Sequence, residues 1–487
     1  MMRYLESLLT RVTMYALTFG TLTVLICQAA IMPFFNAVSF TPFELAASSA
    51  VFIGVSIGVS YLLARIYGLR SHISSAYITA LILILLCTPT LDGITLLEYA
   101  LIATIAQASK FVLAYKGRHI FNPAAIGIFI AGLLEVGYAT WWIGSPTFVW
   151  AVAIAGFLVL YKTRELSLGA TYVATSLVVL AIVGVSPLTA LLSWPVLFFA
   201  GFMLSEPLTL PPKRWQRLML AVVVALAASV PYSLGPLHSS PILALVIGNI
   251  LAFALAFRER AGVQLFLKDI RALTPSVGEF VFTSRTPIAF TPGQYIELTL
   301  PHTRADMRGI RRAFSIVNAP GSNELRLGIK FYAPSSTFKQ ALRRLPEGTS
   351  VQTTGIHGDF VLPRNPSKKL LFVAGGIGIT PFVSQVQAYG HQRDIMVLYF
   401  VRKPEDAAYV SELRASGATV HCFSAGPTTE NDFAQAAILD AKLLASYVPD
   451  ASTRYAYISG PPAMVASTKI FLRGRVKSIK TDYFSGY

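Results

Sequence analysis

The sequence predicts a polytopic α-helical membrane domain of about ten helices, followed by an antiparallel β-barrel and an α/β nucleotide-binding domain. Three observations predict this order. Hydrophobic residues make up 54% of the 487 residues and charged residues only 13%, which is too apolar for soluble domains alone. The long apolar runs lie before residue 260, and short alternating segments begin near Gly262. Beyond Lys368, buried strand runs alternate with apolar helix patterns.

These changes in pattern define the domain boundaries. We expect a transmembrane domain over residues 1–260, a barrel over 261–366 and an α/β domain over 367–487. The apolar runs are candidate spans, because about 20 apolar residues cross a bilayer. They are 12–35, 43–63, 76–88, 94–114, 124–141, 147–161, 170–185, 188–204, 218–230 and 241–257.

The orientation of the spans follows from their positive charges. Lys and Arg occupy every second connection, as at Arg65 and Lys162, and the intervening connections have none. Positive charge collects on the cytoplasmic side, so we expect a multi-pass protein of a cell membrane, prokaryotic in type, with both termini in the cytoplasm. The first run, 12–35, is long for a cleavable signal and is expected to be a span.

Composition also limits the classes of ligand and partner that the protein is expected to bind. The net charge of +16 suits membrane lipid and phosphate-bearing cofactors, and no nucleic-acid motif is present, so we expect no nucleic-acid partner. The three cysteines are too few for the four thiolates of an iron–sulfur centre, and no other metal site is expected. A pair of haems would need four histidines on facing helices, but residues 1–260 hold only His72, His119 and His238.

Two proline-bearing segments, Asn122-Pro123 and Glu206-Pro207, interrupt the apolar runs on the cytoplasmic side. Proline breaks a helix, which within a membrane is tolerated only inside protein or beside a cavity. Helix ends offer amide donors, and an acid at a span end is costly without a role, so Asn122 and Glu206 are candidate flavin-binding residues. The alternative is two capped loops, with Glu206 at a helix start.

The segments RHIFNPA (118–124) and FMLSEPLT (202–209) are similar to motifs of a membrane family. That family contains the B subunit of the sodium-translocating NADH:quinone reductase and the D subunit of the Rnf complex. The resemblance, over about residues 60–257, implies flavin inside the membrane, often FMN esterified to threonine. The nearest match to the esterification motif, 167–171, carries an inserted Leu168, so we expect Thr171 to be an ordinary helix residue. Loosely bound FMN or riboflavin remains open.

A glycine turn follows the apolar strand run 369–374 and precedes an apolar helix pattern. In this strand–turn–helix context, glycines let backbone amides approach a pyrophosphate at the N-terminus of a helix. The turn is one of several ordered motifs: PGQY (292–295), RAFS (312–315), STFK (336–339), GGIGITP (375–381) and SGPP (459–462).

Together these motifs resemble the ferredoxin–NADP reductase superfamily over residues 262–487. Arg312 would offer a guanidinium fork to the FAD pyrophosphate, Phe314 an aromatic face to the flavin, and Ser315 a hydroxyl near N5. The expected FAD-binding residues are Tyr295, Arg312, Ala313, Phe314, Ser315, Ser336 and Thr337. The expected nicotinamide-binding residues are Gly375, Gly376, Gly378, Thr380, Pro381, Gly460, Pro461 and Met464.

Four residues are the catalytic candidates. Ser315 would lie near flavin N5, and Ser459 stands near nicotinamide C4, where many family members have Cys. Asp482-Tyr483-Phe484 is similar to the family's Glu-x-Tyr, which implies that Phe484 covers the flavin. Both NADPH and NADH remain open, because Arg402 and Lys403 could meet a 2′-phosphate but are also ordinary surface charges.

The sequence therefore predicts an FAD-dependent NAD(P)H oxidoreductase. Electrons would pass from cytosolic NAD(P)H through FAD into the membrane domain, and on to a quinone or an extracytoplasmic redox protein, with ion coupling open. The alternative is a flavin or ion transporter whose reductase-like half regulates transport.

Because two rings cannot share one flavin face, Phe484 must move before nicotinamide stacks there. We expect deletion of residues 484–487 to tighten NAD(P)H binding or to alter the rate of flavin reduction. Single-turnover stopped-flow absorbance measures both quantities. Unchanged values for both would contradict a covering role for Phe484.

Overall fold

The computed structural model describes residues 12–67, 73–115, 118–211, 213–235, 237–257, 263–302, 310–332, 335–428 and 432–482. The chain divides into two compact units, Met1–Arg258 and Glu259–Tyr487. The first is a helical unit, and the second holds a barrel and a parallel sheet. The predicted boundary between barrel and α/β domain near residue 366 stays a prediction.

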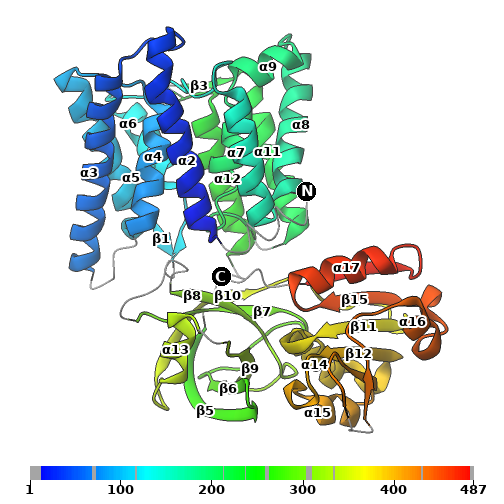
Figure 1. The fold of residues 1–487 in the computed structure, drawn as a ribbon. Coiled ribbons are helices and arrows are strands. Elements are labelled where there is room, and N and C mark those ends of the chain that lie inside the picture. The colour runs from blue at the N-terminus through cyan, green and yellow to red at the C-terminus, as the bar shows by residue number, and fades with distance from the viewer. Residues whose placement is uncertain are drawn as a thin grey trace. The chain divides into compact units, whose positions relative to one another are not determined.

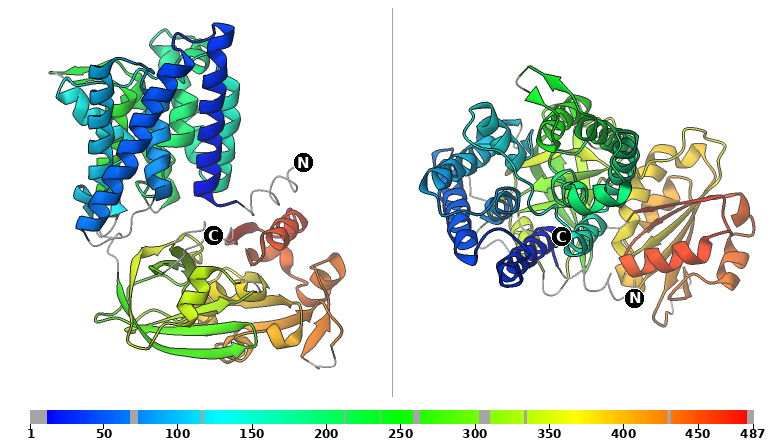
Figure 2. Two further views of the ribbon diagram at one scale, coloured as in Figure 1. Left: turned by 60° about the vertical axis from the view of Figure 1, so that its left-hand side comes forward. Right: turned by 90° about the horizontal axis from the view of Figure 1, so that it is seen from above.

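The helices of the first unit run side by side as a bundle (Figures 1 and 2). Polar residues begin several of them: Thr41, Asp92, Asn122 and Ser240 each accept a hydrogen bond from the backbone three residues on. The elements are α2 Met14–Ile31, α3 Pro42–Ile66, α4 Ile73–Leu86, α5 Gly93–Val112, α6 Pro123–Leu133, α7 Val149–Thr163, α8 Leu166–Ile182, α9 Pro187–Ser193, α10 Val196–Phe198, α11 Arg214–Ser229 and α12 Pro241–Ala256.

Helix length departs from the predicted spans. Among the described residues, Met14–Phe35 and Pro42–Ile66 are long and apolar enough to cross a membrane, and five shorter apolar helices of this unit have 11–17 residues. The expected span 124–141 is wrong as a continuous helix, because α6 ends at Leu133 and Glu135 turns the chain with a φ of 57°. A ten-span domain therefore stays a proposal.

The expected span 188–204 is also not one helix. Trp194 is extended and Pro195 follows it, which separates α9 from α10. The chain then forms a π-helical turn over Phe199–Met203, and Ser205 donates a hydrogen bond to the Gly201 carbonyl at 2.7 Å. Apolar composition predicted the run, but proline and the π-turn decided the backbone.

The barrel of the second unit is antiparallel, as predicted. Its strands follow the order β8-β7-β10-β5-β6-β9, and a bridge between Ile316 and Leu327 joins the two ends. Helix α13, Thr337–Arg343, places Phe338 and Leu342 in the core. The strands are β5 Gln264–Thr274, β6 Val277–Thr283, β7 Tyr295–Thr299, β8 Arg311–Ser315, β9 Glu324–Lys330 and β10 Ser350–His357.

The sheet of the predicted α/β domain is parallel and has the order β14-β13-β12-β11-β15-β16. Figure 1 shows its strands β15, β11 and β12 side by side. From β11 the chain proceeds to β12 on one side, and it later returns to β15 on the other. Its strands are β11 Leu370–Gly375, β12 Ile395–Val401, β13 Thr419–Ser424, β14 Phe433–Gln435, β15 Tyr455–Ser459 and β16 Ser478–Asp482, and its helices are α14 Thr380–Tyr389, α15 Val410–Ala415, α16 Ala441–Tyr447 and α17 Pro462–Leu472.

Strand β11 is buried along its whole length because both sheet faces are covered. Phe372 and Ala374 pack with α14, α15 and barrel residues such as Phe360. Leu371 and Val373 pack on the opposite face with α16 and α17. One face of the sheet is therefore shared with the barrel, which matters for the site.

At the amino edge of the sheet, the buried Arg454 guanidinium joins three segments. It contacts Asp394 at 2.7 Å and Asp450 at 2.7 Å, and it donates to the Leu370 carbonyl at 3.0 Å. Lys369 also contacts Asp450, at 2.9 Å. Hydrogen bonds from Arg454, and then from Lys369, lower the pKa of Asp450 to about 2.

Because this pKa is below the unfolded value of about 3.9, Asp450 stabilises the fold above about pH 4, and this contribution is lost as the pH falls toward 2. We expect Asp450→Asn to unfold at lower urea concentration at pH 7 and to lose less stability on acidification. Circular dichroism at several pH values measures both. Asp432→Asn, which removes an exposed pair with Arg414, is the control. Parallel pH curves for Asp450→Asn and the parent would contradict the assignment.

Candidate active site

Strand β8 carries the predicted flavin motif on its two faces. Arg312 and Phe314 share the face that meets Phe338 of α13: the Arg312 guanidinium carbon lies 5.2 Å from the Phe338 ring centre, and the Phe314 ring 6.1 Å from it. Arg312 is buried and donates to the Arg311 carbonyl at 2.6 Å. The cation and the aromatic face expected for FAD are thus brought together by one buried phenylalanine.

Ser315 lies on the opposite face of β8, paired across the ladder with Tyr295 of β7. Its hydroxyl is buried and has no hydrogen-bond partner among the described residues. Ala313 points to the same side as Ser315, because strand side chains alternate. A buried hydroxyl without a partner is costly, so its presence fits a ligand atom such as flavin N5.

The start of α13 holds the other two residues predicted to bind FAD. Ser336 caps the helix by accepting from the Lys339 amide at 3.3 Å. The Thr337 hydroxyl lies 3.0 Å from Nε2 of His302, whose Nδ1 lies 2.8 Å from the Leu300 carbonyl. None of the sequence motifs includes His302. The one feature of the sequence that could have pointed to this residue is its position just after strand β7.

The glycine turn meets the end of β15 at the reversal of strand order. Ala374 pairs with Ser459, so the turn and the SGPP segment leave the sheet at one edge. A side chain on Gly378 would lie 2.6 Å from the Gly460 Cα, so only glycine permits this approach. Gly376 has a φ of 52° and open space where a side chain would be. Nucleotides bind at such reversals in open parallel sheets.

The other predicted nicotinamide residues surround the same turn. A side chain on Gly375 would lie 2.9 Å from Pro461 and 3.4 Å from the terminal methyl of Met464, on α17. Thr380 begins α14 and donates to the Ile377 carbonyl at 2.9 Å, and Pro381 follows in the first turn of that helix. The fold thus gathers these residues around one turn.

Two of the catalytic candidates are neighbours. Ser459 pairs with Asp482 of β16 in register, and both point to the sheet face that carries Tyr457. The Ser459 hydroxyl is buried without a hydrogen-bond partner among the described residues. On the same face, Tyr457 and Lys480 both donate to the Val361 carbonyl, at 3.0 and 3.3 Å. Phe484 lies outside the described residues.

In the helical unit, one pocket is lined by both proline-bearing segments, by α2 and by α4. Asn122 caps α6 and donates to the Met203 carbonyl at 3.3 Å. Glu206 contacts His119 at 2.7 Å, and its second carboxylate oxygen is buried without a hydrogen-bond partner among the described residues.

Part of the sequence interpretation of these segments needs correction. Asn122 is a helix cap, as the alternative expected, but Glu206 lies in a turn after the π-helical segment and starts no helix. Thr171 lies inside α8. Within the described ranges, no group of three or more His, Cys, Asp or Glu side chains could hold a metal ion.

Comparison with known proteins defines the class of the C-terminal half. Residues 372–469 match the family described as oxidoreductase NAD-binding domain. The chain is similar to a ferredoxin–NADP reductase B of Sorangium cellulosum, at 32% identity over 31% of this chain and 62% of that protein. It is similar to a flavohemoprotein of Pseudomonas aeruginosa, at 30% identity over 37% of this chain and 47% of that protein.

The chain spans about half the length of the curated relatives it matches. Among solved structures, the cytochrome b5 reductase domain of Ulva prolifera nitrate reductase matches with 19% identity and a TM-score of 0.41, over 46% of this chain and 98% of that one. The C-terminal half is thus a ferredoxin–NADP reductase-like module for FAD and NAD(P).

Removal of the Arg312 guanidinium should weaken FAD binding. Loss of a charge-assisted, two-point contact costs about 1.5–3 kcal/mol, or roughly 10- to 100-fold in affinity. Arg312→Lys, which keeps the charge without the fork, should fall between Arg312→Ala and the parent. Flavin fluorescence titration of purified protein measures the affinity.

The control is Arg344→Ala, which removes an exposed arginine at the far end of α13. Parent-like FAD affinity for Arg312→Ala would show that Arg312 does not bind the pyrophosphate.

Proposed function

We propose that this protein is an FAD-dependent NAD(P)H oxidoreductase that passes electrons into a membrane domain. The observation that carries the proposal is the pair of buried serine hydroxyls, Ser315 and Ser459, without hydrogen-bond partners among the described residues. One lies on the predicted flavin strand and the other beside the glycine turn. The names of similar proteins, including a 2-halobenzoate 1,2-dioxygenase electron transfer component of Burkholderia cepacia, support electron transfer.

Bound FAD would supply two-electron hydride acceptance from nicotinamide and one-electron release to a further acceptor. Arg312 and the amides at the start of α13 would hold the FAD phosphates, with Phe314 against the ring. Ser315 would donate a hydrogen bond toward N5. Ser459 would orient the nicotinamide from the other side, with Asp482 beside it.

We further propose that electrons leave FAD for a second flavin, FMN or riboflavin, in the helical unit. The proposed site is the pocket that Asn122 and Glu206 both line. The unpartnered Glu206 oxygen could accept a hydrogen bond from a flavin ring N–H. The final acceptor would be a quinone or an extracytoplasmic redox protein, with ion coupling as a further proposal.

The membrane location is supported by the two long apolar helices and by the positive charges at alternate connections. The choice between NADH and NADPH stays open. The alternative, a transporter with a regulatory reductase-like half, would bind these cofactors without turnover. Reduction of a soluble artificial acceptor by NAD(P)H separates the two functions, because only the oxidoreductase supports it.

We expect acid precipitation of purified full-length protein to release FAD and a second flavin, counted by absorbance and mass spectrometry. A covalently held second flavin would remain with the precipitate and add to the protein mass. Asn122→Ala and Glu206→Gln should each lower occupancy of the second flavin and slow quinone reduction about tenfold, because each removes one hydrogen bond of about 1.5 kcal/mol. Reduction of the artificial acceptor should not change.

Glu135→Gln is the control, because Glu135 is exposed in the loop after α6. A single flavin per chain, together with quinone reduction unchanged in both variants, would contradict the second site.

A further inference from the structure

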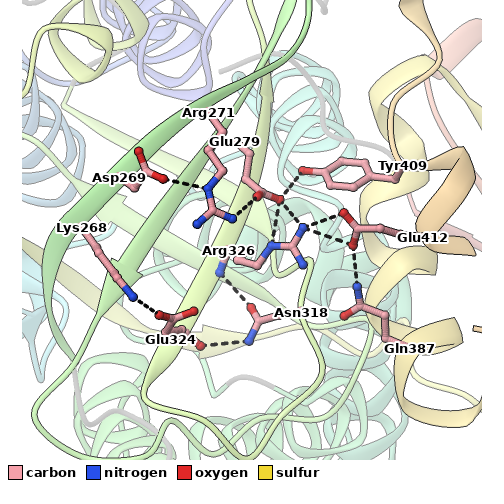
Figure 3. Close-up of polar contacts among 10 residues, drawn as sticks. All are labelled: Lys268, Asp269, Arg271, Glu279, Asn318, Glu324, Arg326, Gln387, Tyr409 and Glu412. Atoms are coloured by element: carbon pink, nitrogen blue, oxygen red, sulfur yellow. Dashed lines mark hydrogen bonds and ion pairs between the residues drawn. The ribbon is translucent and has the colours of Figure 1, made fainter. Parts of the chain in front are cut away.

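A network of charged and polar side chains joins the barrel to the α/β domain within the second unit (Figure 3). At its centre, Arg326 of β9 lies between two carboxylates. Its Nη2 is 2.7 Å from Glu279 of β6 and 2.8 Å from Glu412 of α15. The guanidinium therefore links the two domains through one side chain.

Glu279 is the most buried member, with 1% of its side chain exposed. Tyr409, the residue before α15, donates its hydroxyl to Glu279 at 3.1 Å from the α/β side. Burial, and then the neighbouring Glu279 carboxylate, raise the pKa of Tyr409, so this phenol stays a neutral donor. Arg271 approaches Glu279 less closely, at 3.8 Å.

The network lies directly beside the glycine turn. Glu279 pairs across the strands with Gly328 of β9. A side chain on Gly328 would lie 2.7 Å from the Tyr409 hydroxyl and 2.8 Å from the Thr380 methyl. Gly328 thus lets Tyr409 and Thr380, the first residue of α14, rest against the barrel backbone.

Helix α14 is held by further hydrogen bonds from the barrel side. Gln387 donates to Glu412 at 2.7 Å and accepts from the Ala319 amide at 3.1 Å. Ser384 donates to the Asn318 carbonyl at 2.8 Å, and Asn318 also accepts from the Arg326 amide at 2.8 Å. The helix that begins at the nicotinamide turn is therefore tied to the strand that carries Arg326.

Glu279 is buried and Arg326 is mostly buried, whereas Glu412 is about one-third exposed. Moving Tyr409 and Glu412 away would leave the charges of Glu279 and Arg326 with fewer partners in a low-dielectric interior, which is costly. The network therefore fixes the position of α14 and its glycine turn relative to the barrel. Hydride transfer needs the two reacting atoms about 3–3.5 Å apart, and a shift of about 1 Å can cost on the order of 100-fold in rate.

We propose that Arg326, Glu279, Glu412 and Tyr409 are positioning residues for hydride transfer: they hold the nicotinamide turn against the barrel at the reacting distance. None of these four residues is among those proposed to bind FAD or nicotinamide. The inference rests on the proposed reductase function and deepens it, because it assigns the geometry of the transfer to this network.

The test uses full-length protein and two variants. Tyr409→Phe removes only the hydroxyl, and Arg326→Lys keeps the charge but cannot bridge two carboxylates through one fork. Glu324→Gln is the control: it lies on the same strand, β9, but pairs with Lys268 at the exposed surface. Rapid mixing with NADPH and with NADH measures the limiting rate of flavin reduction, the half-saturating concentration and the long-wavelength absorbance of the stacked nicotinamide–flavin complex.

We expect both variants to lower the limiting rate about 10- to 100-fold and to weaken the stacking absorbance. FAD content and the half-saturating concentration should stay within about twofold of the parent, since those contacts lie elsewhere. Glu324→Gln should behave as the parent. If Arg326→Lys fails to fold, Tyr409→Phe decides alone.

A limiting rate and stacking absorbance equal to those of the parent in Tyr409→Phe would overturn the positioning role. A fall in FAD content that accounts for the whole loss of rate would also overturn it, because the network would then be structural only. If the parent itself is not reduced by either nucleotide, the proposed reductase function fails first, and the inference with it.

Discussion

The parallel pairing of β11 with β15 is the constraint on which the reductase unit depends. It sets Ala374 beside Ser459, so the glycine turn and the SGPP segment leave the sheet at the same edge. Strand order reverses at this place, which leaves room above the sheet for a nucleotide. The absence of a side chain at Gly378 permits the contact with Gly460. Register, chain reversal and close packing therefore form the site together.

The barrel completes the site because it shares one face of the parallel sheet. Phe360 packs with Phe382 and Tyr457, and polar groups from β6 and β9 meet α14 and α15 around Arg326. Apolar contacts hold the two domains together, but the hydrophobic effect is non-directional and does not fix their relative orientation. The partly buried charge network adds direction, because the carboxylates Glu279 and Glu412 each have specific donors. Two domains joined in this way can keep two cofactors in a fixed geometry.

Much of this arrangement could be predicted from residues. Strand β12 agrees with the apolar run expected over 395–401, and the glycine turn of GGIGITP lies between strand β11 and helix α14, as its context predicted. The two expected spans that are not continuous helices share one cause. The runs 124–141 and 188–204 were read from apolar composition, but a turn at Glu135 and a break at Pro195 decided the backbone there. Composition reports burial better than it reports conformation.

The sequence by itself determined where long apolar runs give way to short alternating segments and where the glycine turn lies, because periodicity and glycine spacing express those features directly. The reductase-like class of the C-terminal half was implied by the resemblance of its ordered motifs to a known family. Only the tertiary structure decided which residues meet. The pairing of Ser459 with Asp482, and the convergence of Glu279, Arg326 and Glu412, join positions far apart in the chain. Such contacts depend on strand register and on packing between domains, which no local pattern encodes.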